Sequence, residues 1–216
     1  ALGTNVGWFK KSINGGSTWS DITIPLYLEL GSCATGSNDF TRGQAWFDLI
    51  LGVYPNDPNR IIAGGIDLHR STDGGANWES LSYWTGQCDD YVHADQHAIV
   101  FKEGSDSEAI FGNDGGVFWS EELDQSNPNF EETILSYNTA LFYAAAAANE
   151  PGSNIYLAGA QDNGSNLFTT AGINSTIEVT GGDGAYCFIS QNNPELMITS
   201  YVYNNYYFTL NGWDTF

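Results

Sequence analysis

Basic residues are scarce in this chain. Its 216 residues include 6 Lys and Arg against 26 Asp and Glu, so the formal net charge is −20. A surface this acidic repels phosphate groups, which excludes nucleic-acid binding through a basic footprint. The same charge excludes a basic face for anionic membranes. We therefore expect neither a nucleic acid nor a membrane surface as the partner.

Long apolar runs are also missing. The longest aliphatic stretches, at 49–53 and 141–148, fall far short of the roughly 20 residues that a membrane helix needs, so no membrane insertion is expected. Disorder is excluded too, because 42% of residues are hydrophobic and only 15% are charged. The start, Ala1–Thr4, lacks the pattern of a secretory signal peptide, so we expect a processed or partial chain.

Sustained helical periodicity is the third absence. Apolar runs are short and are separated by turns rich in Asn and in the 25 glycines, which predicts an all-β chain of many short strands. Residues 141–148 are compatible with a helix on propensity alone. Their place in the repeat described below favours a strand instead.

A turn motif occurs twice with the pattern S-x-[DN]-x-G-x-x-W. In this motif the Asp or Asn oxygen accepts backbone N–H groups and the Gly adopts a conformation that side chains forbid. We expect the Trp to pack inward and anchor the hairpin. The motif residues are Ser12, Asn14, Gly16 and Trp19 in the first copy and Ser71, Asp73, Gly75 and Trp78 in the second.

A longer repeat runs in phase with these turns. Four apolar runs end in small residues at Gly64, Gly112, Gly159 and Thr199, at steps of 48, 47 and 40 residues. An apolar strand precedes each run, a third strand follows it, and most units have a fourth. Four strands every 40 to 50 residues predict four-stranded antiparallel blades of a β-propeller. The predicted blades are a partial one at 1–30 and four more at about 44–84, 93–136, 141–180 and 184–216, which together favour a segment of a larger propeller.

The two turns resemble the Asp-box, or bacterial neuraminidase repeat, of sialidases, sortilin-type receptors and xyloglucan-cleaving glycosidases. Further motifs make the chain similar to secreted, glycosyl hydrolase-like Asp-box propellers of Bacteroidota that use type IX secretion. This resemblance implies a secreted or cell-surface protein and a glycosidase-like ancestry. The further motifs lie at 91–98, 112–117, 159–164 and 181–184.

Loops in a propeller alternate between two faces, so one face should collect carboxylates. Second-to-third-strand loops place Asp67, Asp114 and Asp162 on the same face as Asp89, Asp90, Asp95 and Asp183, which lead into inner strands. Glycoside hydrolysis needs two carboxyl groups, and crowding raises one pKa of such a pair. Our catalytic candidates are Asp48, Asp95 and Asp183. The alternative is that these residues only accept hydrogen bonds from loop backbone.

His93, Asp95 and His97 would share one side of a strand. They could then bind a divalent metal, or Asp95 could orient both rings in a hydrogen-bond network. No cofactor is expected beyond a structural Ca²⁺ held by loop oxygens. Sialidases clamp a carboxylate with three convergent arginines, and we expect Arg42, Arg60 and Arg70 not to converge, which argues against sialidase activity.

Cys33 and Cys88 lie in long loops on one predicted face. A bridge between them would close a 55-residue loop and contribute about 4 kcal/mol in the chain-entropy model. Secretion favours the bridge, although three reduced thiols are the alternative. Cys187, on an apolar run, is expected to be a buried free thiol.

Three functions remain open. The first is a secreted module that binds a polysaccharide or a cell-surface protein through the acidic loop face, with His93, His97 and the loop Asp residues. The second is an active glycoside hydrolase with paired Asp. The third is a structural or adhesion component of a surface assembly. Aromatic residues suited to sugar stacking, or to filling the space between blades, are Trp46, Phe47, Trp84, Tyr91, Tyr143, Tyr186, Tyr203, Tyr206 and Tyr207.

Overall fold

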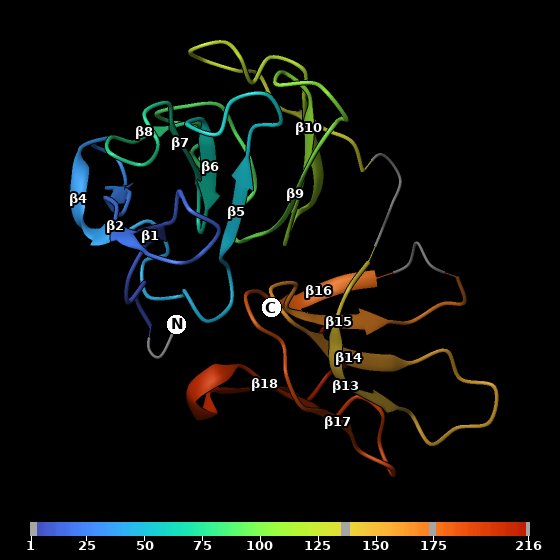
Figure 1. The fold of residues 1–216 in the computed structure, drawn as a ribbon. Coiled ribbons are helices and arrows are strands. Elements are labelled where there is room, and N and C mark those ends of the chain that lie inside the picture. The colour runs from blue at the N-terminus through green and yellow to red at the C-terminus, as the bar shows by residue number, and fades with distance from the viewer. Residues whose placement is uncertain (1–3, 135–138, 173–175, 215–216) are drawn as a thin grey trace. The chain divides into compact units, whose positions relative to one another are not determined.

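The computed structural model describes residues 4–134, 139–172 and 176–214 (Figure 1). The chain divides into unit 1, Ala1–Ser136, and unit 2, Tyr137–Phe216. The described residues form short antiparallel β-strands and one 3₁₀ turn. Within the described ranges, no helix is long and apolar enough to span a bilayer.

Unit 1 contains two β-ribbons and two four-stranded sheets. In each four-stranded sheet, strands that follow one another in sequence are neighbours and run antiparallel. The ribbons pair β1 (Lys10–Lys11) with β2 (Ser20–Asp21) and β3 (Leu26–Leu28) with β4 (Thr35–Asp39). The sheets are β5 (Ile50–Val53), β6 (Ile61–Gly64), β7 (Leu68–Ser71) and β8 (Glu79–Ser80), then β9 (Gln96–Phe101), β10 (Ala109–Asn113), β11 (Gly116–Ser120) and β12 (Glu131–Glu132).

Unit 2 repeats the same arrangement. Its first sheet has four strands in sequence order, and its second has three. The first sheet is β13 (Phe142–Ala147), β14 (Tyr156–Ala160), β15 (Ser165–Phe168) and β16 (Thr176–Thr180). The second is β17 (Cys187–Ile189), β18 (Met197–Ser200) and β19 (Tyr206–Thr209), with the 3₁₀ turn at Val202–Asn204 between its last two strands.

These sheets confirm the predicted fold class, an all-β chain of four-stranded antiparallel sheets consistent with part of a β-propeller. Within the run 141–148, Phe142–Ala147 form strand β13, as the repeat predicted and helix propensity did not. The ribbon strand β4 was not predicted. The fourth strand expected in the 93–136 unit is seen as β12, Glu131–Glu132. The predicted blade ends at 136 and 216 lie outside the described residues.

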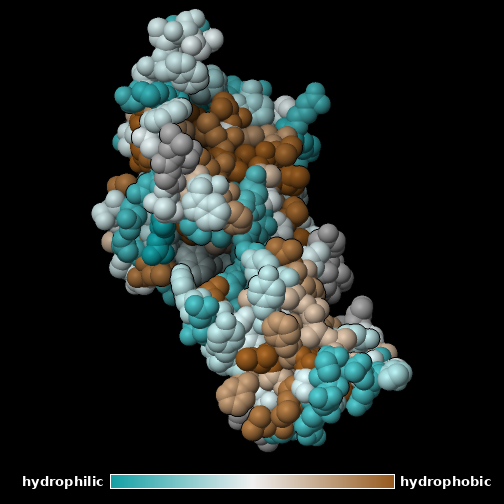
Figure 2. All heavy atoms as spheres, turned by 90° about the horizontal axis from the view of Figure 1, so that it is seen from below, coloured by the Kyte–Doolittle hydropathy of each residue, from teal (hydrophilic) through white to brown (hydrophobic). Residues whose placement is uncertain are grey.

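Sheets within each unit pack face to face over an apolar core. In unit 1, Ile50 and Ile62 of the first sheet join Phe111 and Phe118 of the second in one buried cluster. In unit 2, Leu157 and the other core residues of β13–β16 pack on Cys187, Ile189 and Met197. Other large apolar residues reach the surface, where Figure 2 shows them among hydrophilic ones.

Both repeated turns have the expected hydrogen bonds. Asp73 Oδ1 accepts the N–H groups of Ala76 (3.0 Å) and Asn77 (2.9 Å), while Ser71 Oγ accepts that of Gly75 (2.8 Å). This turn connects β7 to β8, the third and fourth strands of their sheet. In the first copy, Asn14 Oδ1 accepts the N–H of Thr18 at 2.9 Å.

The prediction that both tryptophans pack inward is wrong for Trp19. Its side chain is 59% exposed and its Nε1 donates to Gly16 O within the same turn at 3.0 Å. Trp78 is half-buried, stacks on Phe9 at 5.7 Å between ring centroids and donates to Thr23 O at 2.8 Å. The difference lies in their partners: Trp78 contacts Phe9 and Thr23 outside its own turn, whereas the Trp19 indole bonds only within its turn among the described contacts.

Candidate functional site

Four aspartates lie at one end of the unit 1 sheets. Asp95 immediately precedes β9, and Asp48 lies two residues before β5. Asp67 and Asp114 lie in the β6–β7 and β10–β11 connections. We call Asp48, Asp67, Asp95 and Asp114 the acidic rim. Their charges interact, because Asp95 raises the pKa of both Asp48 and Asp67, and Asp114 raises that of Asp95.

Asp48 is fully buried, and neither of its carboxyl oxygens reaches a hydrogen-bond partner in another described residue. Burial raises its pKa from 3.8 to about 7, and the negative charge of Asp95 adds to the effect. A carboxyl group without a partner in a dry site favours its neutral form. Asp48 is therefore a carboxylic acid that keeps its proton close to neutral pH.

Asp67 is the second buried carboxyl group. Its Oδ1 accepts the Trp84 N–H at 2.7 Å, whereas Oδ2 has no partner within the described part of the chain. Burial raises its pKa to about 7 despite the Trp84 hydrogen bond, and Arg42 lowers it. The rim thus holds two acids with pKa values near neutrality.

Asp95 adopts a left-handed backbone conformation, φ 66°, directly before β9. Its Oδ1 accepts a hydrogen bond from Gln44 Nε2 at 3.2 Å. Burial and Asp114 raise the pKa of Asp95, whereas His93 and His97 lower it. Because β9 begins at Gln96, the expected strand that would align His93, Asp95 and His97 is not formed.

His97 pairs with Asp114 rather than with Asp95. Its Nε2 lies 2.5 Å from Asp114 Oδ1, and His93 Nδ1 lies 3.1 Å from Ala94 O. The expectation that Asp95 orients both rings is therefore wrong. Among the described residues, no group of three or more His, Cys, Asp or Glu side chains is placed to hold a metal ion.

Exposed aromatic rings adjoin this His–Asp pair. The Phe47 ring meets His97 edge to face at 4.8 Å, and the Trp46 ring lies 5.5 Å from Phe47. Trp46 is 68% exposed and Phe47 40% exposed. An aromatic platform therefore stands next to acceptor and donor groups of the acidic rim.

The candidates in unit 2 form a separate pair. Asp183 Oδ1 accepts the Asp162 N–H at 3.0 Å, and Asp162 has a left-handed φ of 55°. Asp183 lies four residues before β17, whereas Asp95 immediately precedes β9. Within unit 1, the catalytic candidates Asp48 and Asp95 interact, because Asp95 raises the pKa of Asp48. The third candidate, Asp183, belongs to unit 2.

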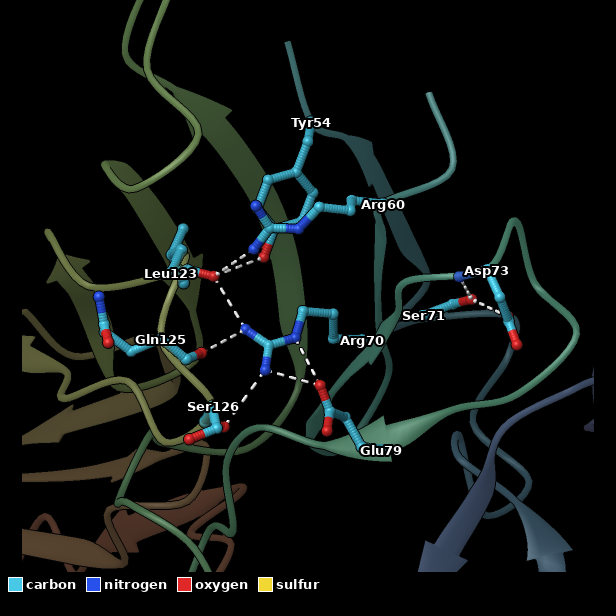
Figure 3. A network of polar contacts seen from close by, with 9 residues as sticks. All are labelled: Tyr54, Arg60, Arg70, Ser71, Asp73, Glu79, Leu123, Gln125 and Ser126. Carbon is cyan, nitrogen blue, oxygen red and sulfur yellow. Dashed lines mark hydrogen bonds and ion pairs between the residues drawn. The ribbon is translucent and has the colours of Figure 1, made fainter. Parts of the chain in front are cut away.

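Arg60 and Arg70 meet at one backbone carbonyl (Figure 3), while Arg42 contacts Tyr27, so the three arginines form no common clamp. Arg60 Nη2 and Arg70 Nη1 donate to Leu123 O at 2.9 and 2.8 Å. Arg70 also donates to the carbonyls of Gln125 and Ser126 and pairs with Glu79. These two arginines thus fasten the β11–β12 connection to the neighbouring sheet.

Arg42 acts on the acidic rim instead, where its positive charge lowers the pKa of Asp67. Its Nη1 donates to Tyr27 Oη at 3.0 Å, and the guanidinium lies 4.3 Å from the centre of the Tyr27 ring. Trp84 Nε1 donates to the same hydroxyl at 3.3 Å. Tyr27 and Gln44 were not among the predicted site residues, because their partners are 15 to 57 residues away and no local motif links them.

The predicted disulfide between Cys33 and Cys88 is confirmed, with Cα atoms 5.5 Å apart. Cys187 is a buried free thiol, as predicted, and donates to Leu157 O at 2.9 Å. Asp89 and Asp90 adjoin this disulfide in the wall of a cavity of about 310 Å³, where Asp90 Oδ2 accepts the Phe130 N–H at 2.6 Å.

Comparison with known proteins gives similarity of fold only. No family model matches the chain, and no significant match is found among curated proteins. Similar solved structures are a GH74 enzyme from Niastella koreensis (16% identity, TM-score 0.49, 98% of this chain and 31% of that one) and the GH74 xyloglucanase from Xanthomonas campestris (14%, 0.45, 90% and 30%). YCF48 from Cyanidioschyzon merolae matches at 13% identity and TM-score 0.33, over 94% of this chain and 61% of that one. The chain thus spans about 30% of the length of the GH74 enzymes.

Proposed function

We propose that unit 1 binds an uncharged polysaccharide at the acidic rim. The observation that carries the proposal is the exposed Trp46–Phe47 platform beside the His97–Asp114 pair. Aromatic rings offer a large apolar face to the C–H face of a sugar ring. Neighbouring carboxylates and imidazoles accept and donate hydrogen bonds to sugar hydroxyls.

Charge supports a neutral glycan over an acidic one. With a net charge of −20, the protein repels uronate and sulfate groups over the range set by ionic strength. Neutral chains meet no such barrier. We therefore expect binding to xyloglucan, mixed-linkage β-glucan or galactomannan, and none to polygalacturonate.

The test is affinity electrophoresis and calorimetry with these four polysaccharides. Trp46→Ala should weaken binding by about tenfold or more, since one stacked aromatic side chain contributes about 1–2 kcal/mol. Trp19→Ala is the matched control, because Trp19 is comparably exposed but lies in the β1–β2 turn. Absence of binding to every polysaccharide, or equal losses in both variants, would contradict the proposal.

A second candidate function is glycoside hydrolysis, favoured by one observation. Asp48, with its pKa of about 7, lies beside Asp95 and has the protonation state of a general acid at neutral pH. Because Asp48 is fully buried, its surroundings must rearrange before its carboxyl group can reach a substrate. Asp48→Asn and Asp95→Asn should abolish release of reducing sugar while Asp183→Asn retains it. Absence of release by the unaltered protein would exclude this function.

We also propose that the protein acts outside the cytoplasm, at the cell surface or after secretion. The Cys33–Cys88 bridge supports this location, because such bonds persist in oxidising compartments. Alkylation of thiols in intact producing cells, followed by mass spectrometry, should leave Cys33 and Cys88 unmodified. Alkylation of both would contradict the proposal.

A further inference from the structure

In each unit, two β-sheets pack against each other through apolar faces. In unit 1, Ile99 and Phe101 of β9 pack against the β5–β8 sheet. In unit 2, Cys187, Ile189 and Met197 turn the inner face of β17–β19 toward β13–β16. Alternation along a strand sends the intervening residues to the opposite face.

The opposite face of β17–β19 is apolar as well. Cross-strand pairing of Phe188 with Ile198, and of Ile198 with Phe208, places these three side chains in one row. They are 63%, 37% and 68% exposed. Tyr206 and Tyr186, 61% and 70% exposed, share this face by their two-residue spacing from Phe208 and Phe188. We call these five residues the aromatic face.

Charge is absent from the segment that supplies most of this face. Residues 196–213, 18 in number, include no Asp, Glu, Lys, Arg or His, although the chain as a whole carries −20. A surface with this composition loses little on dehydration, whereas burying an unpaired carboxylate costs several kcal/mol. Exposed apolar patches of this kind mark interaction sites.

We propose that the aromatic face is the dimerisation surface of this chain and packs on the same face of a second copy. A twofold contact sets the same patch against itself, so the charge-free segment of one copy meets that of the other. Two copies of −20 repel each other elsewhere, and this surface brings no carboxylates together. The mode of contact, one apolar sheet face on another, is the one both units already use internally.

Salt dependence distinguishes this association from an electrostatic one. Raising NaCl from about 20 mM to about 500 mM screens the repulsion between copies and strengthens apolar burial. Light scattering coupled to size exclusion should therefore give twice the 23.5 kDa chain mass at high salt and a smaller dimer fraction at low salt. Contacts between opposite charges would respond in the reverse direction.

Variants locate the contact. Phe208 lies on the edge strand β19 and is mostly exposed, so Phe208→Ser should leave the fold intact and weaken association at least tenfold. Ile198→Glu places a charge at the centre of the row and should give a monomer. The matched control is Val100→Ser, on a 58% exposed residue of β9, which should leave association unchanged.

Several results would overturn the proposal. One is a single-chain mass at about 100 µM protein and high salt, because a surface of this kind should associate at least at that concentration. Another is a dimer that Val100→Ser dissociates and Phe208→Ser does not. A third is a single-copy protein that insoluble cellulose retains unless Phe208 is changed, which would assign the face to a polysaccharide. None of these results depends on binding at the acidic rim, which Trp46→Ala tests separately.

Discussion

Gly52 of β5 lies directly against Ile99 of β9. A Cβ at Gly52 would come within 2.9 Å of Ile99 Cδ1 and within 3.1 Å of Phe101 Cε2. Glycine is usually unfavourable inside a strand, yet here its missing side chain lets the two sheets of unit 1 approach. The contact explains why a glycine occupies the middle of an otherwise apolar strand.

Gly52→Ala should therefore overpack the core and destabilise unit 1 by about 1–3 kcal/mol. Gly112→Ala is the control on another inner position, because a Cβ there meets Ala98 Cβ at an ordinary 3.5 Å. Urea unfolding followed by tryptophan fluorescence measures both. Equal midpoints for the two variants would show that Ile99 and Phe101 move aside at little cost.

Asp48→Asn should change the pH dependence of stability. The folded protein keeps the Asp48 proton at pH values where an unfolded chain, with a pKa of 3.8, has released it. Stability from this group is thus fully present below about pH 4 and is lost as pH rises through about 7. Asparagine does not titrate, so the variant does not lose this stability. The free energy of unfolding of the variant minus that of the unaltered protein should therefore be larger at pH 8 than at pH 4, by on the order of a few kcal/mol.

Asp73→Asn should change the pH dependence of stability in the opposite direction, because the pKa of Asp73 is lowered instead of raised. Hydrogen bonds from the Asn77 N–H and side chain, and from Ser71, lower the pKa of Asp73 to about 2. Its stabilising effect is present above pH 4 and disappears as pH falls toward 2. Thermal unfolding at pH 2, 4, 6 and 8 separates the two groups. Parallel pH profiles for Asp48→Asn and Asp73→Asn would contradict both assignments.

His69 should destabilise the fold in mild acid. The side chain is buried against Phe40, and burial lowers its pKa from 6.5 to about 4. Between these values the unfolded chain binds a proton that the folded chain does not, so stability falls as pH drops from about 6.5 to 4. His69→Gln should remove this slope in denaturant titrations at pH 7 and pH 4.5. An unchanged slope would place the effect on another group.

Arg70→Lys should destabilise unit 1 although the charge is kept. The guanidinium bonds three carbonyls of the β11–β12 connection and Glu79, and a single ammonium cannot reproduce that fork (Figure 3). Carbonyls left without partners cost about 1–3 kcal/mol each when buried. Lys102→Arg, at an exposed pair with Glu108, is the control and should change stability by less than about 0.5 kcal/mol.

The sequence was sufficient for the strands of the repeated sheets, though not for ribbon strand β4, and for the aspartates of the candidate site. Regular spacing of Gly64, Gly112, Gly159 and Thr199 located the second strand of each repeat, because an apolar run ending in a small residue has the same role in every sheet. The link between Asp48 and Asp95 followed from their places before inner strands. The local repeat pattern therefore predicts both the positions of the strands and the residues that lie before them.

Long-range contacts and special backbone angles escaped that reasoning. The left-handed φ of Asp95 breaks the two-residue alternation that was to align His93 with His97, and no sequence pattern announces it. Arg60 and Arg70 meet at Leu123 because the β11–β12 connection folds over the neighbouring sheet. Such contacts depend on packing between repeats, which a repeat pattern does not encode.

The Cys33–Cys88 bond also determines how far unit 1 extends under mechanical tension. Tension applied on either side of the bond passes through two sulfur atoms, so the enclosed 55-residue segment, with all of β5–β8, bears none of it. In a pulling experiment, an oxidised molecule would extend by roughly 190 Å less than a reduced one, at about 3.5 Å per extended residue. A single covalent bond therefore protects the first four-stranded sheet from tension that would otherwise unravel it strand by strand.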